Sequence, residues 1–108
     1  MRLPTDATLL IAPGAEPALE QVWREERLPV LALDGDLAGI EAALEAIGTA
    51  TVVACDENAA RAAATLGFRT FLVGEGAVVG AVTVSLSQTL DAARFARARE
   101  RWKAARSV

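Results

Sequence analysis

The chain has 108 residues, of which 53% are hydrophobic, so it has enough material for one packed domain and too little for two. It contains no histidine and a single cysteine, Cys55, which excludes an internal disulfide, a zinc site of the usual nitrogen and sulfur ligands, and histidine-activated serine or cysteine catalysis. Residues 1–80 carry twelve acids and five arginines, whereas residues 81–108 carry six bases and two acids, so we expect a basic final element on an acidic body.

The first predicted unit is a buried strand followed by a helix. Residues 7–12 form a short apolar run that Pro13 and Gly14 close with a turn. Pro17 suits the first turn of a helix that ends near Arg27. The predicted core stripe of this helix contains Leu19, Val22 and Trp23.

A second unit follows with the same pattern. Residues 30–33 form another buried run, and Asp36 is placed to cap the next helix. Gly48 supplies the C-terminal stop of that helix. Its apolar residues recur at steps of three and four: Leu37, Ile40, Leu44 and Ile47.

The third unit has a third strand over residues 51–55 and an alanine-rich helix over residues 59–66. Residues 56–58 provide the cap and first turn of this helix. A fourth strand is expected over residues 68–73, after Gly67.

The last part of the chain predicts a strand and a long helix. Val82, Val84 and Leu86 alternate with polar residues, and the short connection before them predicts an antiparallel fifth strand at an edge. Residues 88–106 form the final helix, capped from Ser87. Its apolar stripe contains Phe95, Ala98, Trp102 and Ala105, with Arg94, Arg97, Arg101 and Arg106 mostly outside it.

These elements predict one α/β domain over residues 1–108, with three layers and a Rossmann-like, mostly parallel sheet of about five strands. Helices cover both faces and the last strand is antiparallel. No apolar stretch approaches the ~20 residues of a membrane span, and residues 1–6 lack a secretory apolar region. We therefore expect a cytoplasmic protein that does not enter a membrane.

Candidate ligand-binding residues follow the predicted strands, because ligands of open parallel sheets bind beyond the carboxyl ends of the strands. They are Gly14, Asp34, Asp36, Cys55, Asp56 and Glu75. Two interpretations of the acids stay open. Asp34, Asp36 and Asp56, with Glu57 and Glu75 nearby, offer oxygen ligands for Mg²⁺, as in phosphoryl-transfer enzymes. Alternatively, Asp36, Asp56 and Asn58 cap helices, Glu57 complements a helix dipole, and the chain holds neither metal nor cofactor.

Read in order, residues 6–77 resemble an isochorismatase-like cysteine hydrolase, the family that includes nicotinamidases. The resemblance lies in the strand at 7–13, the helix and strand ending at 27–33, the segment 36–55 and the strand 67–77. It implies a catalytic aspartate, lysine and cysteine. This chain has Ala12 or Pro13 at the aspartate's place, its only lysine is Lys103, and Cys55 stands on the strand side of its loop. None of the catalytic residues carries over, so the resemblance implies a pared-down relative without that chemistry.

Two functions follow. The first is a non-catalytic domain that acts as a homo-oligomer or as a subunit bound to a protein partner, with Phe95 and Trp102 at the interface. The acidic overall charge argues against nucleic acid as the partner. The alternative is a Mg²⁺-dependent phosphotransfer enzyme or phosphate-ester hydrolase that uses the acids at the carboxyl edge of the sheet.

Overall fold

The computed structural model of the protein describes residues 1–33 and 37–106. Strands and helices alternate along these residues. In chain order the elements are β1 (Thr8–Ile11), α1 (Pro17–Glu25), β2 (Val30–Ala32), α2 (Leu37–Ala46), β3 (Thr51–Ala54), α3 (Glu57–Thr65), β4 (Arg69–Val73), β5 (Ala81–Val84) and α4 (Leu86–Arg106).

The strands form one sheet in the order β2-β1-β3-β4-β5, with every neighbouring pair parallel. Leu10 of β1 pairs with Leu31 on one side and with Ala54 on the other. Because β1 and β3 are neighbours, the chain reverses its direction of travel across the sheet between these two strands. This is a Rossmann-like α/β fold with three layers, as the sequence predicts.

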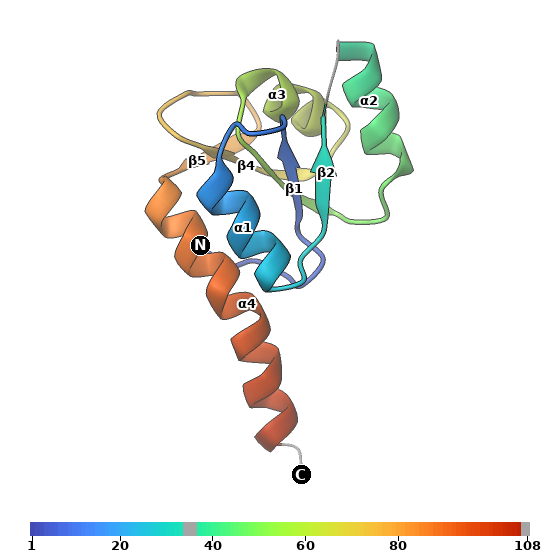
Figure 1. The fold of residues 1–108 in the computed structure, drawn as a ribbon. Coiled ribbons are helices and arrows are strands. Elements are labelled where there is room, and N and C mark those ends of the chain that lie inside the picture. Colours follow the sequence, from blue (N-terminus) through green and yellow to red (C-terminus); the bar gives the residue numbers. More distant parts are fainter. Residues whose placement is uncertain (34–36, 107–108) are drawn as a thin grey trace.

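Helices cover both faces of the sheet, and each face has its own hydrophobic core (Figure 1). The period of two along the strands explains this arrangement, because successive side chains point to opposite faces. The strand side chains that point towards α1 and α4 are Leu9, Ile11, Val53, Phe71 and Val84. Towards α2 and α3 point Leu10, Val52, Ala54 and Leu72.

Helix α1 confirms the predicted stripe. Pro17 stands at its start, and Leu19, Val22 and Trp23 are all buried. The indole Nε1 of Trp23 donates a hydrogen bond of 3.0 Å to the carbonyl oxygen of Ala7, just before β1. This bond satisfies the only polar atom of a fully buried side chain and ties α1 to the first strand.

The prediction that the fifth strand is antiparallel is wrong. β5 lies at the predicted edge, but it pairs in parallel with β4, so that Val73 faces Val84. The connection 74–80 has no helix, yet seven extended residues span up to ~23 Å, and the register requires a return of only ~10 Å. Val78 packs into the core beside α3 and holds this crossover against the sheet.

The predicted cap of the last helix is also wrong, because Ser85 caps it instead of Ser87. The amide nitrogen of Gln88 donates to Oγ of Ser85 at 3.1 Å, and the amide nitrogen of Ser85 donates to Oε1 of Gln88 at 3.1 Å. This reciprocal pair is a capping box. Leu86, which the alternation placed on the strand, is therefore the first residue of α4.

Helix α4 has two apolar faces, of which the sequence indicated one. The face that packs on α1 and the sheet consists mostly of small buried residues, Thr89, Ala92, Ala93 and Ala96, and the partly buried Leu86 and Leu90 pack beside them. The predicted stripe lies elsewhere on the helix, with Phe95 67% and Trp102 60% exposed. The C-terminal part of α4 extends beyond the rest of the domain and lengthens the molecule, whose extents including this helix are 47 × 25 × 24 Å (Figure 1). No helix within the described ranges is long and apolar enough to cross a membrane.

Candidate functional site

The loops after β1 and β3 meet at the point where the strand order reverses, which is where ligands bind in open α/β sheets. The predicted residues Gly14, Cys55 and Asp56 lie in these two loops. Gly14 has φ 75°, a left-handed conformation that suits glycine, within a turn closed by the bond from Ala15 N to Ala12 O. The backbone nitrogen of Cys55 donates to the carbonyl oxygen of Leu10 at 3.4 Å, which ties the start of the loop after β3 to β1.

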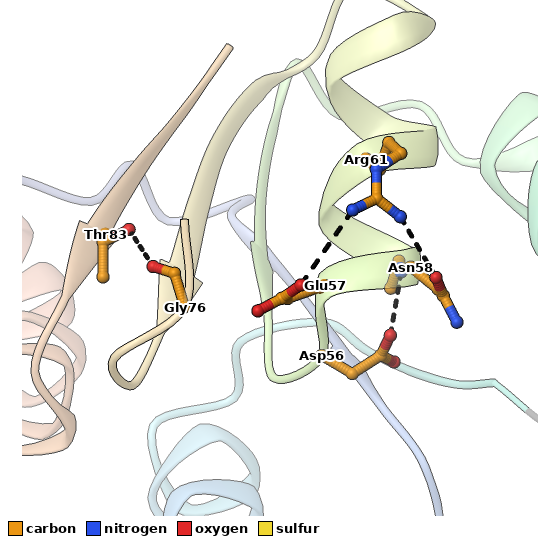
Figure 2. Close-up of polar contacts among 7 residues, drawn as sticks. Asp56, Glu57, Asn58, Arg61, Gly76 and Thr83 are labelled. Atoms are coloured by element: carbon orange, nitrogen blue, oxygen red, sulfur yellow. Dashed lines mark hydrogen bonds and ion pairs between the residues drawn. The ribbon is translucent and has the colours of Figure 1, made fainter. Parts of the chain in front are cut away.

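Asp56 serves as the N-cap of α3. Its carboxylate accepts a hydrogen bond of 3.0 Å from the amide nitrogen of Ala59, and its own backbone is extended (Figure 2). In the first turn, Glu57 forms an ion pair with Arg61 at 3.9 Å, while Asn58 accepts a hydrogen bond from Arg61 at 3.3 Å. The predicted capping function of Asp56 is confirmed, and Glu57 lies where a negative charge complements the helix dipole.

The thiol of Cys55 is half-buried and poorly suited to nucleophilic chemistry. Burial raises its pKa to about 12, and the nearby carboxylates of Glu16 and Asp56 add to the increase because they repel a thiolate. The thiolate is the nucleophilic form of cysteine. At neutral pH this side chain is therefore a protonated, inert thiol that packs against the core beside α1 and α4.

The other three predicted ligand-binding residues are Asp34, Asp36 and Glu75. Asp34 and Asp36 lie outside the described residues. Glu75 is exposed on the β4–β5 connection. Among the residues that the structure describes, no group of three cysteine, aspartate or glutamate side chains comes together to hold a metal. The Mg²⁺ site of Asp34, Asp36 and Asp56 thus stays a prediction, and of its three carboxylates the described one is engaged in capping.

The β4–β5 connection begins at the same carboxyl edge of the sheet. Oγ1 of Thr83 donates a hydrogen bond of 2.7 Å to the carbonyl oxygen of Gly76, so the loop is held against β5 (Figure 2). A Cβ atom on Gly76 would lie 2.5 Å from Oε1 of Glu57. Glycine at this position therefore leaves room for the side chain of Glu57 beside the loop.

A second candidate surface lies on α4, away from the carboxyl edge. We define the α4 stripe as Phe95, Ala98 and Trp102. Together with Arg99 these residues line an open apolar depression of about 440 Å³ on the surface of α4. An adjoining cavity of about 240 Å³ shares Phe95 and Arg99 and is also lined by the exposed Met1. Polar and charged side chains, among them Arg2, Gln88 and Asp91, make up much of its remaining lining, so the apolar surface narrows where the projecting helix meets the N-terminal segment.

Two arginines anchor α4 to the domain and so position this surface. Arg97 donates to the carbonyl oxygens of Glu26 at 3.1 Å and Arg27 at 3.0 Å, at the C-terminus of α1. Arg99 donates to the carbonyl oxygen of Leu3 at 2.9 Å. The last carbonyls of a helix carry partial negative charge, so a guanidinium there is favourable. The sequence shows these arginines as part of a basic helix, but their backbone partners are separated from them by 71, 70 and 96 residues.

Comparisons of the chain with protein families, with curated proteins and with solved structures found no match.

Proposed function

We propose that this chain is a cytoplasmic, non-catalytic domain that acts by association, either as a homo-oligomer or as a subunit of a larger assembly. One observation carries the proposal. Phe95 and Trp102 are the largest exposed hydrophobic side chains, and both lie on one face of a helix that extends beyond the domain. Their exposure supports the predicted interface.

An aromatic ring exposed to water is unfavourable in free energy, and burying it in an interface is favourable. Burying the exposed parts of the two rings against a partner stabilises a complex by ~2–4 kcal/mol. Tryptophan and arginine are among the residues most enriched at positions that dominate binding energy, and Trp102 of the α4 stripe lines the same surface as Arg99. Because Arg97 and Arg99 fix the helix to the domain, the stripe is presented in one orientation.

The carboxyl edge supports the non-catalytic half of the proposal. Cys55 is a protonated thiol, and Asp56 is engaged in capping α3. These features agree with a pared-down relative of the isochorismatase-like hydrolases, in which the fold is kept and the nucleophile is not. That kinship is part of the proposal.

The size of the native complex tests this function. In extracts of the cells that produce the protein, we expect the wild-type chain to sediment as a species much heavier than its own mass of 11.3 kDa. The double variant Phe95→Ser/Trp102→Ser is expected to sediment as the isolated chain. The control Asp56→Asn/Glu75→Gln alters the carboxyl edge and should sediment like the wild type. A monomeric wild type, or a double variant that stays in the complex, would overturn the proposal.

The alternative of a Mg²⁺-dependent phosphotransfer enzyme or hydrolase rests on Asp34, Asp36, Asp56 and Glu75. It predicts that Mg²⁺ raises the melting temperature and that Asp34→Asn removes this increase. A melting temperature unchanged by Mg²⁺ would eliminate it.

A further inference from the structure

The α4 stripe has the spacing of a helix-helix seam. Phe95, Ala98 and Trp102 follow one another at steps of three and four, which are the a, d and a positions of a heptad. Ala105, also exposed, stands at the next d position. The seam is therefore about two heptads long, and the open apolar depression at its centre is lined by side chains of α4 alone.

The charges that flank this seam are all of one sign. Arg94 and Arg101 occupy the g positions on one side, and Arg99 occupies the e position on the other. Arg94 and Arg101 are exposed, whereas Arg99 is partly covered through its bond to Leu3. Between Ala92 and Trp102 the sequence holds one acid, Glu100, at the f position, and the charged residues at the e and g positions are all arginines.

This charge pattern discriminates between partners, because residues at e and g of one helix face those at e or g of the other. A second copy that paired through the same seam would bring arginine against arginine, whether the two helices ran parallel or antiparallel. A helix with glutamate or aspartate at these positions would instead form charge-complementary pairs around the same apolar core.

We propose that the α4 stripe binds an acidic amphipathic helix of another protein, with an apolar a/d seam and acidic flanks, in preference to a second copy of this chain. This inference rests on the proposed function and names its partner class. Asp91 lies one turn before Phe95 and lines the adjoining cavity, so the acidic flanks are required opposite residues 94–101 and not beyond them.

Two matched synthetic helices test the inference. Each has about three heptads with leucine at a and d, and they differ only in carrying glutamate or lysine at every e and g position. Fluorescence anisotropy of the labelled peptides gives the dissociation constants. We expect the glutamate peptide to bind at least about tenfold more tightly than the lysine peptide. We also expect this difference to shrink as salt screens the flanking charges.

Variants separate the seam from its flanks. Arg94→Glu/Arg101→Glu should reverse the preference between the peptides, while Arg61→Glu, which reverses an exposed arginine on α3, should leave it unchanged. Phe95→Ala should weaken binding of the glutamate peptide without reversing the preference for it over the lysine peptide. Circular dichroism of each variant checks that the fold is retained.

The contrary outcomes are distinct. Equal binding of both peptides, or tighter binding to phosphatidylserine vesicles than to the glutamate peptide, would overturn the inference. If neither peptide binds and the chain self-associates through Phe95 and Trp102, this inference falls while the proposed function stands. If neither peptide binds and the native complex does not depend on these residues, both fall.

Discussion

Nε of Arg97 donates a hydrogen bond of 3.1 Å to the carbonyl oxygen of Glu26, which lies 71 residues earlier in the chain. Glu26 is the C-cap of α1, so the guanidinium of α4 satisfies a backbone acceptor that the helix leaves open. Nη2 of the same side chain reaches the carbonyl oxygen of Arg27. One side chain thus closes the end of α1 and fixes the direction in which α4 projects.

Removing this link should destabilise the domain. Arg97→Ala loses two hydrogen bonds from a charged donor, so we expect the free energy of unfolding to fall by ~1–2 kcal/mol in urea denaturation. Amide hydrogen exchange should quicken in the last turn of α1. Arg101→Ala removes an exposed arginine one turn later and is expected to change the free energy by less than ~0.5 kcal/mol. Equal effects of the two substitutions would contradict the anchoring function of Arg97.

The two tryptophans provide a matched pair for the core and the projecting surface. Trp23 is fully buried and bonded to Ala7, whereas Trp102 is 60% exposed. Trp23→Phe leaves a cavity and an unsatisfied carbonyl group, so the free energy of unfolding should fall by ~2–3 kcal/mol. Trp102→Phe should change it by less than ~0.5 kcal/mol. Urea denaturation measures both, and a large loss in the Trp102 variant would mean that this ring supports the fold.

Two serines at the start of α4, Ser85 and Ser87, should differ in how much they stabilise the protein. Ser85→Ala removes half of the capping box with Gln88, and we expect a loss of ~1 kcal/mol in the free energy of unfolding. Ser87 is exposed within the first turn of the helix, so Ser87→Ala should stay within ~0.5 kcal/mol of the wild type. Thermal denaturation followed by circular dichroism compares them. The opposite ranking would restore Ser87 as the cap.

Cys55 should be slow to react in the native protein. Its pKa rises from 9.0 to about 12, so at pH 8 the native thiol holds far less thiolate than the unfolded one. We expect alkylation by iodoacetamide at pH 8 to be at least about tenfold slower in the native state than in urea. Because the pKa is higher in the folded state, the protonated thiol adds to the free energy of unfolding. This contribution is complete below pH 9 and is lost as the pH rises towards 12. Faster alkylation in the native state would identify an activated thiol.

How much the sequence revealed depended on how each element is stabilised. Leu19, Val22 and Trp23 predicted the buried face of α1 correctly, because a helix that packs one stripe on a sheet shows it as a period of 3.6. Asp56 was likewise predicted as a cap, because capping is a local interaction. Both predictions needed only neighbouring residues.

Other features were decided by distant contacts. The direction of β5 depends on the path of the 74–80 connection, which Val78 fixes by packing beside α3. On α4, the sequence indicated the stripe of large side chains but not the packed face, which Ala92, Ala93 and Ala96 form through close approach. Alanine carries a weak hydrophobic signal, so the sequence did not distinguish this face from the exposed stripe.

The most direct test of the central claim, that the chain acts through the α4 stripe, is site-specific photocross-linking in the cells that produce the protein. A photoreactive phenylalanine analogue at position 95 places the reactive group in the stripe, and the same analogue at position 75 places it at the carboxyl edge. We predict strong cross-links to a protein chain from position 95 and few from position 75. Cross-links from position 75 alone, or equal cross-linking from both positions, would contradict it.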